Sequence, residues 1–131
     1  EAPLFREVGV FRKGLQVTMT DFIQVTTAVD NAEAAEAIAS ALVSQRLAAC
    51  VQIVGPVKST YWWDNDVQVN EEWLCIVKTR ADLFEELNAV LRQVHPYDVP
   101  ELLATPIVAG GKAYLDWLQG ELKQAHPAAI P

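Results

Sequence analysis

The sequence is poor in the side chains that bind soft metals or form disulfides. Its 131 residues include two cysteines, two histidines and one methionine. Cys50 and Cys75 are too far apart to form a Cys-x-x-Cys pair, which argues against a disulfide framework and against zinc-finger spacing. Two isolated cysteines are typical of reduced thiols, and we therefore predict a cytoplasmic protein, with a periplasmic location as the alternative.

Basic charge and long apolar runs are also missing. Ten Lys and Arg residues face seventeen Asp and Glu residues, so the net charge is -7. Proteins that follow the phosphates of nucleic acids carry a basic patch or stripe instead. No apolar run approaches the roughly 20 residues that a helix needs to cross a bilayer. We expect neither nucleic acid nor a membrane as a partner.

Motifs of the common enzyme classes are absent as well. The sequence has no nucleophile elbow, P-loop, Rossmann glycine pattern or His-Glu-x-x-His motif. A nucleophilic pair of Cys50 and His95 is formally possible, but no third residue that would orient it is evident. We predict a protein that is not an enzyme, with no catalytic residues and no organic cofactor.

What is present is a well-patterned segment of one-domain size, residues 19–124. Residues 1–18 precede the only methionine, Met19, and show no clear apolar period. We expect them to be an N-terminal extension that is disordered or left by the expression vector. Residues 125–131 are expected to form a flexible tail.

Periodicity predicts four strands and three helices between these ends. Asp30, with Glu33 three residues later, is expected to cap the first helix, and Gly55-Pro56 indicates a bend or bulge in the second strand. The predicted elements are a strand at 22–29, a helix at 31–47, a strand at 49–63, a strand at 67–79, a helix at 81–94, a strand at 102–108 and a helix at 112–124. This order, β-α-β-β-α-β plus a terminal helix, predicts an α+β, ferredoxin-like sandwich with a long hairpin between its second and third strands.

The hairpin carries more aromatic surface than a monomer leaves in water. Trp62, Trp63 and Trp73 lie in its arms, next to Tyr61, and the helices of this fold cover only one face of the sheet. The 67–79 strand carries Trp73, Cys75 and Val77 on one face and Leu74 and Ile76 on the other, which predicts burial on both sides at its centre. We infer a closed-ring oligomer with these four aromatic residues at its interface. The alternative is an aromatic site for a cation or small ligand.

The segment His95-Pro96-Tyr97-Asp98-Val99-Pro100-Glu101 gathers an imidazole, a phenol and two carboxylates within seven residues. Each proline fixes its own φ and pushes the preceding residue out of the helical region. The preceding helix is therefore expected to end near Val94 or His95. Such a rigid segment is a candidate site, and it is equally a candidate structural joint.

Four motifs in register resemble the CutA family of divalent-cation tolerance proteins. They are Ala48-Ala49-Cys50-Val51; Tyr61-Trp62-Trp63 with Glu71, Glu72 and Lys78-Thr79 downstream; His95-Pro96-Tyr97 with Pro100-Glu101; and Tyr114-Leu115-x-Trp117-Leu118. Their order and spacing agree along nearly all of residues 22–122. The resemblance implies a ferredoxin-like fold, a tight homotrimer built from extended hairpins, and a link to divalent metals, copper in particular. It implies no catalysed reaction.

The sequence departs from the resemblance at two positions. Some relatives have a cysteine in the first strand and a second histidine just before the His-Pro-Tyr motif, and these have been associated with copper binding. Here Thr26 and Val94 stand at those places, and neither can replace a soft or imidazole ligand. A copper site in this chain must be weaker or differently composed.

Three residues are the candidate metal ligands. His95 is the leading one, because a neutral imidazole binds Cu(II) or Zn(II), with Cys50 and Glu101 as helpers. The expected ligand is copper or another divalent cation. The competing interpretations are that His95 caps its helix and that Cys50 is a small buried hydrophobe. Carboxylates near the hairpin turn, Glu71 and Glu72 among them, are a further place for hard cations or simply a solvated turn.

Two other functions remain open. In a small-ligand-binding signalling trimer, Lys78, Tyr97 and Glu101 would bind a small anion or nucleotide in clefts between subunits. That convergence is implied by the resemblance, and Lys78 and Glu101 would there form an ion pair. In a structural or assembly trimer, the motif residues would serve only to hold the subunits together.

Overall fold

The computed structural model describes residues 5–11 and 15–124, with side chains described from residue 20 onward. The elements follow one another as β1 (Phe5–Phe11), β2 (Leu15–Thr20), β3 (Phe22–Val29), α1 (Ala32–Ser44), β4 (Cys50–Trp63), β5 (Asp66–Arg80), α2 (Phe84–Val94), β6 (Leu103–Pro106) and α3 (Lys112–Glu121). A short 3-10 turn, Ala81–Leu83, leads into α2. From β3 onward this is the predicted β-α-β-β-α-β order with a terminal helix.

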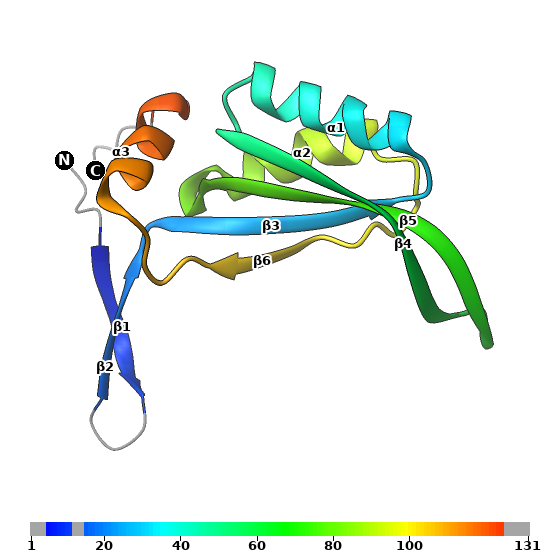
Figure 1. The fold of residues 1–131 in the computed structure, drawn as a ribbon, viewed down its shortest axis with the longest axis horizontal. Helices are drawn as coiled ribbons and strands as arrows, with labels where there is room; N and C mark the ends of the chain where they lie inside the picture. The colour runs from blue at the N-terminus through cyan, green and yellow to red at the C-terminus, as the bar shows by residue number, and fades with distance from the viewer. Residues whose placement is uncertain (1–4, 12–14, 125–131) are drawn as a thin grey trace, which may run out of the picture.

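Strands β3 to β6 form one antiparallel sheet in the order β4-β5-β3-β6. Helices α1 and α2 lie together over one face of this sheet, and α3 lies at one end (Figure 1). Among residues 5–11 and 15–124, no layer covers the opposite face (Figure 1). The α+β architecture and the long hairpin are therefore confirmed.

Residues before β3 form a separate two-stranded hairpin. β1 pairs antiparallel with β2 and projects away from the helices (Figure 1). The sequence showed no period there, so these strands were not predicted. That residues 1–18 are an added extension stays a prediction, and the expected tail at 125–131 lies outside the described residues.

The core lies between the sheet and the helices. Alternate residues of β3, beginning at Val25, face the helices, and apolar residues at helical spacing face them in return. The largest fully buried side chains are Phe22, Ile38, Leu42, Leu47, Leu83, Leu87, Leu91, Leu115, Leu118, Val25, Val29 and Val77. Each of the leucines contributes roughly 1.5–3 kcal/mol by leaving water.

The N-terminus of α1 corrects the predicted cap. Asn31 is the N-cap, because its extended backbone (φ -154°) lets the side-chain oxygen accept the Ala34 N–H at 2.7 Å. Asp30 instead accepts a hydrogen bond from the Asn31 side-chain amide. The predicted box of Asp30 and Glu33 was wrong by one residue, since two adjacent residues both have capping side chains.

The C-terminus of α1 forms a Schellman motif. Leu47 N–H returns to the Leu42 carbonyl at 3.0 Å, and Arg46 N–H returns to Val43. Arg46 adopts the left-handed region at φ 58°, where glycine is usual. The helix therefore ends at Ser44, three residues before the predicted end. α3 is likewise shorter than predicted, and β6 occupies only four of seven predicted residues.

The β4–β5 hairpin has the predicted length and irregularity. Its register shifts between Val54 and Val57, which confirms the bulge at Gly55-Pro56. A Cβ on Gly55 would overlap the Trp73 ring, so a glycine is needed there. The tip has φ of 53° at Asp64 and 62° at Asn65, the signature of a tight hairpin turn.

One burial prediction for β5 needs correction. Cys75 and Val77 are fully buried against the helices, as expected, but Leu74 and Ile76 on the opposite face are only half-buried. The reason is that the described part of the chain places no second layer on that face.

Candidate functional site

The candidate site lies where the C-terminal end of β3, the outer part of the hairpin and the segment after α2 meet. His95 ends α2: its N–H bonds the Leu91 carbonyl at 2.8 Å, and its own backbone is already extended at φ -78° and ψ 132°. Pro96 enforces this extended conformation, because it excludes the preceding residue from the helical region. The predicted end of the helix is confirmed.

The His95 ring is held on both sides. The side chain is 8% exposed, Nε2 lies 3.0 Å from the Ala28 carbonyl oxygen, and Nδ1 accepts the Tyr97 N–H at 3.1 Å. A carbonyl can only accept, so these partners assign the neutral tautomer with its proton on Nε2. Burial lowers the pKa of His95, although the Ala28 carbonyl and the carboxylates of Asp30 and Glu72 act in the opposite direction. The expected bond to the last helix carbonyls is replaced by one to β3.

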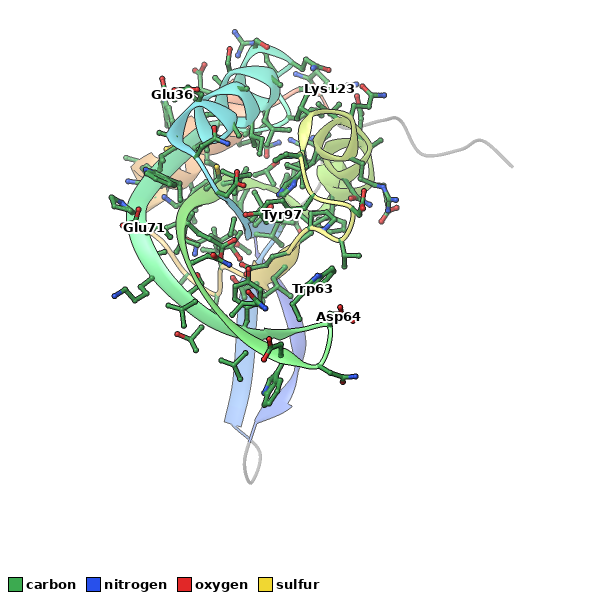
Figure 2. The ribbon with its side chains drawn as sticks, turned by 90° about the vertical axis from the view of Figure 1, so that its right-hand side faces the viewer. Glu36, Trp63, Asp64, Glu71, Tyr97 and Lys123 are labelled. Carbon is green, nitrogen blue, oxygen red and sulfur yellow. The ribbon has the colours of Figure 1, made fainter. Side chains whose placement is uncertain are left out.

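Tyr97 links this segment to the hairpin. Its hydroxyl donates to Glu72 Oε2 at 3.1 Å, and its ring meets the His95 ring edge-on with 5.0 Å between centroids. Burial, and then the hydrogen bond to Glu72, raise the pKa of the Tyr97 phenol. Figure 2 shows Tyr97 on the concave side of the curved hairpin, with Trp63 and Asp64 near the tip.

A hollow of about 510 Å³ lies beside this pair. Its lining residues are Asp30, Tyr61, Val69, Asn70, Glu71 and Tyr97. Asn70 donates from its side-chain amide to the Tyr61 hydroxyl at 2.6 Å, which joins the two arms of the hairpin. Carboxylates and phenols together suit a cation better than an anion.

Lys78 and Cys50 lie elsewhere. They face each other across β4 and β5, and Lys78 Nζ donates to Gln52 Oε1 at 2.6 Å. Six residues of β5 separate Lys78 from Glu72, or about 20 Å of extended strand. Glu101 is exposed in the segment before β6. Within one chain, then, Lys78 lies at one end of the sheet and Tyr97 and Glu101 toward the other. The cleft and the Lys78–Glu101 ion pair were expected between subunits, and both stay predictions.

The predicted metal ligands do not converge either. Across the described residues, no group of three or more His, Cys, Asp or Glu side chains lies close enough to hold one ion. His95 has both ring nitrogens engaged, and Cys50 is at the other end of the sheet. Thr26 lies opposite Ile76 and Leu103. The set of His95, Cys50 and Glu101 therefore does not fit a metal within a single chain.

Sequence reasoning missed three residues of the hollow, Asp30, Val69 and Asn70. Asp30 was interpreted only as a helix cap, although its position directly after a strand was a signal that it lies at an end of the sheet. Asn70 had no signal of its own, because its partner Tyr61 is recognisable only once the hairpin register is known.

The predicted aromatic interface divides into two kinds of residue. Trp62 is 73% exposed and Trp63 57%, both near the tip, and Tyr61 is 38% exposed. Trp73 is half-buried, packs against the core and covers Gly55. In the described part of the chain, no helix is long and apolar enough to cross a membrane.

These features define an α+β protein with a helix-covered sheet, a projecting aromatic hairpin and a rigid His-Pro-Tyr segment. A family model described as CutA1 divalent ion tolerance protein matches residues 23–121. The chain belongs to this family, which confirms the resemblance found in the sequence.

Relatives and solved structures agree with this assignment. The chain is 41% identical over 108 residues to the chloroplastic protein CutA 1 of Oryza sativa, a match that covers 82% of this chain and 61% of that protein. It is 45% identical to the divalent-cation tolerance protein CutA of Thermus thermophilus, over 77% of this chain and 96% of the relative. The crystal structure of CutA1 from Oryza sativa superposes with a TM-score of 0.78 at 40% identity, covering 82% of this chain and 98% of that one.

The names of the family and of the Thermus thermophilus relative describe tolerance of divalent cations rather than a reaction. Their compartments differ: the rice protein is called chloroplastic, and a structure from Archaeoglobus fulgidus is called periplasmic. That structure is 35% identical, covers 78% of this chain and 99% of its own, and has a TM-score of 0.75. The cytoplasmic location of this chain stays a prediction.

Proposed function

We propose that this protein acts as a homotrimer in divalent-cation tolerance and binds copper or another divalent cation at sites that neighbouring subunits complete. The observation that carries the proposal is the surface left uncovered in one chain. An aromatic hairpin tip and a half-buried apolar sheet face are both open, in a chain of the CutA1 family.

Assembly is supported by the shape of the sheet as well as by its side chains. β4 and β6 are the edge strands, so each presents a row of unpaired backbone groups. The outer part of the hairpin extends beyond β3 and curves away from the helices (Figure 1). Trp62, Trp63 and Val69 stand exposed there. A second copy can both pair with such an edge and cover such a tip, and three copies can close a ring.

The distribution of charge supports contact between unlike ends. Lys78 and Cys50 lie at one end of the sheet, while Asp30, Glu71 and Glu101 lie toward the other. In a head-to-tail ring the first end of one subunit meets the second end of the next. The ligands that are separated within one chain would then be brought together.

The two ends offer different donor chemistry. Carboxylate oxygens of Asp30 and Glu71 line the hollow and suit hard cations such as Mn(II). Cys50 is a half-exposed thiol and suits Cu(I). Copper remains the metal that the resemblance implies, and Cys50 is the residue through which this chain would bind it.

Native mass spectrometry tests the assembly first. We expect a trimer for the unaltered chain and smaller species for Trp62→Ala and Trp63→Ala. Trp117→Ala is the matched control, because it removes an exposed tryptophan from α3 instead. A stable folded monomer of the unaltered chain at micromolar concentration would overturn the proposal. If only the control variant lost the trimer, the interface would lie at α3 instead of the hairpin tip.

Metal uptake is measured on the same chelator-stripped protein, titrated separately with Cu(I), Cu(II), Zn(II) and Mn(II). We expect Cys50→Ser to lose Cu(I) and the double variant Asp30→Asn/Glu71→Gln to lose Mn(II). Cys75→Ser is the control for the thiol, since Cys75 is fully buried and burial raises its pKa to about 11. A trimer that takes up none of the four metals would refute the metal part of the proposal.

The hollow favours a second candidate function, a small-ligand-binding signalling trimer. Because Lys78 is remote and carboxylates line the hollow, a ligand with a positive charge fits better than the anion or nucleotide first considered. Such a ligand would raise the melting temperature by binding only the folded state. A purely structural trimer would show neither this shift nor metal uptake.

A further inference from the structure

We infer that His95 is a positioning residue in this chain rather than a metal ligand: its neutral ring joins the segment after α2 to β3 and thereby sets the Tyr97 phenol against Glu72. The inference concerns contacts within one chain, so it does not depend on the trimer proposed above. It assigns the leading candidate ligand of the sequence a different role.

The hydrogen bonds of the ring carry this inference. A metal ion binds imidazole through a nitrogen lone pair. Nε2 carries the proton that it donates to the Ala28 carbonyl at 3.0 Å, and the Nδ1 lone pair accepts the Tyr97 N–H at 3.1 Å. Neither nitrogen has a lone pair free for a metal. Metal binding would break one of these bonds and leave a backbone group without its partner in a largely buried place.

The surroundings of the ring leave little freedom for rearrangement. His95 is 8% exposed, and the Tyr97 ring packs edge-on against it at an interplanar angle of 64°. Pro96 lies between the two rings in sequence and fixes its own φ, so their relative placement is constrained by the backbone. The ring could not turn outward to a metal without moving Tyr97.

The hydrogen bond between His95 and the Tyr97 backbone also fixes where the Tyr97 hydroxyl lies. The backbone N–H of Tyr97 is held by His95, and its hydroxyl donates to Glu72 Oε2 at 3.1 Å. β3, the segment after α2 and β5 are thus joined through two side chains. His95 acts on the hollow only through Tyr97, which is one of the lining residues.

The test begins with the ring itself in the full chain. Nitrogen-15 NMR of histidine side chains should show His95 as the neutral tautomer protonated on Nε2 at neutral pH. Its two nitrogen signals should stay in place when Zn(II) or Cu(I) is added to one equivalent or more per chain. A saturable shift of either His95 nitrogen signal with added metal would overturn the inference.

A variant that keeps one of the two hydrogen bonds supplies an independent readout. His95→Gln can place its amide donor at the Nε2 position, against the Ala28 carbonyl, but it has no atom at the Nδ1 position to accept the Tyr97 N–H. We expect it to keep the metal uptake of the unaltered protein, measured by native mass spectrometry, while its Tyr97 amide exchanges faster with solvent. Loss of metal uptake in a folded His95→Gln protein would contradict the positioning role.

The phenol of Tyr97 reports whether positioning reaches Glu72. In the unaltered protein Tyr97, followed by NMR of labelled tyrosine rings, should titrate above the ordinary tyrosine range. Its midpoint should fall in His95→Gln and also in Glu72→Gln, which serves as the control that removes the negative charge from the acceptor directly. A midpoint that falls only in Glu72→Gln would show that His95 does not position the phenol.

Discussion

The two halves of β5 differ both in residues and in surroundings: residues 66–72 are mostly polar, whereas residues 73–77 are all apolar. Residues 73–80 pair with β3, residues 74–78 also pair with β4, and Val77 is 1% exposed. Residues 66–72 pair with β4 alone, and Val69 is 55% exposed. One continuous strand thus runs from a covered sheet into an uncovered ribbon.

This difference separates two causes of structure. Alternating apolar residues and a tight turn are enough to make the hairpin, because these are local properties. Burial depends on whether another layer lies on top, and α1 and α2 reach only the inner half (Figure 1). The outer half alternates Val67 and Val69 with polar residues, and both valines are exposed. A neighbouring subunit can supply a cover for them.

The largest expected effect on stability comes from making the same substitution, valine to alanine, in each half of β5. Val77→Ala should lower the free energy of unfolding by about 2–3 kcal/mol, from lost apolar burial and a residual cavity. Val69→Ala should change it by no more than about 0.5 kcal/mol in the monomer, as at most exposed positions. Urea unfolding monitored by circular dichroism measures both values.

Repeating these measurements across protein concentrations sharpens the comparison. The effect of Val77→Ala should stay constant, whereas the effect of Val69→Ala should grow once subunits associate. If Val69→Ala cost as much as Val77→Ala at every concentration, the outer half would be covered within one chain and the contrast would fail.

The next effect concerns the inner end of β5, where Arg80 anchors α3. Its side chain is 6% exposed, Nη2 donates to the Lys123 carbonyl at 2.8 Å, and Nε donates to Asp82. Arg80→Ala should lower the free energy of unfolding by roughly 2 kcal/mol, because the lost hydrogen bonds come from a charged donor. Lys58→Ala on β4, opposite Glu71, is the outer control and should have almost no effect. Equal losses would contradict the assigned anchoring role.

Most of the fold could be predicted from local signals in the sequence. The strand at 22–29, the hairpin turn and the end of α2 before Pro96 all follow from residues within a few positions of each other. The cap of α1 could not be decided in that way, because Asp30 and Asn31 both offer a suitable oxygen and only the backbone conformation selects one. The β1–β2 hairpin could not be predicted, because its residues show no clear apolar period.

The candidate site was less accessible to prediction for a physical reason. The partner of the His95 ring is the carbonyl of Ala28, a backbone group that every residue has, 67 positions away. Glu72, the partner of Tyr97, was placed at the turn, whereas the register sets it opposite Val57. Residue types indicated where chemistry can occur, and only the tertiary contacts show which groups are already engaged.

A smaller effect arises from protonation of His95, which links the inner sheet to the hollow. Burial lowers its folded-state pKa below the ordinary value of 6.5, so the unfolded chain binds the proton more readily. Stability should be constant with respect to this group above pH 6.5 and should decrease as the pH falls below it. Urea unfolding between pH 4.5 and 8 measures this dependence. His95→Gln should remove the part of the pH dependence that arises from protonation of His95. An unchanged pH dependence in that variant would exclude His95 as the source.

The smallest expected effect on stability concerns two residues whose backbones adopt the left-handed conformation, one in each region. Arg46 follows α1 with φ 58°, and Asn65 lies at the hairpin tip with φ 62°. At each position the glycine variant is compared with the alanine variant, so that both lose the native side chain and differ only in Cβ. Arg46→Gly should be more stable than Arg46→Ala by about 1 kcal/mol, because a Cβ disfavours this conformation. The difference at Asn65 should be smaller, because a tip paired only with its own hairpin can open locally without unfolding the core. Equal differences at both positions would mean that the outer hairpin unfolds together with the inner sheet, which is the result expected only if a neighbouring subunit holds it.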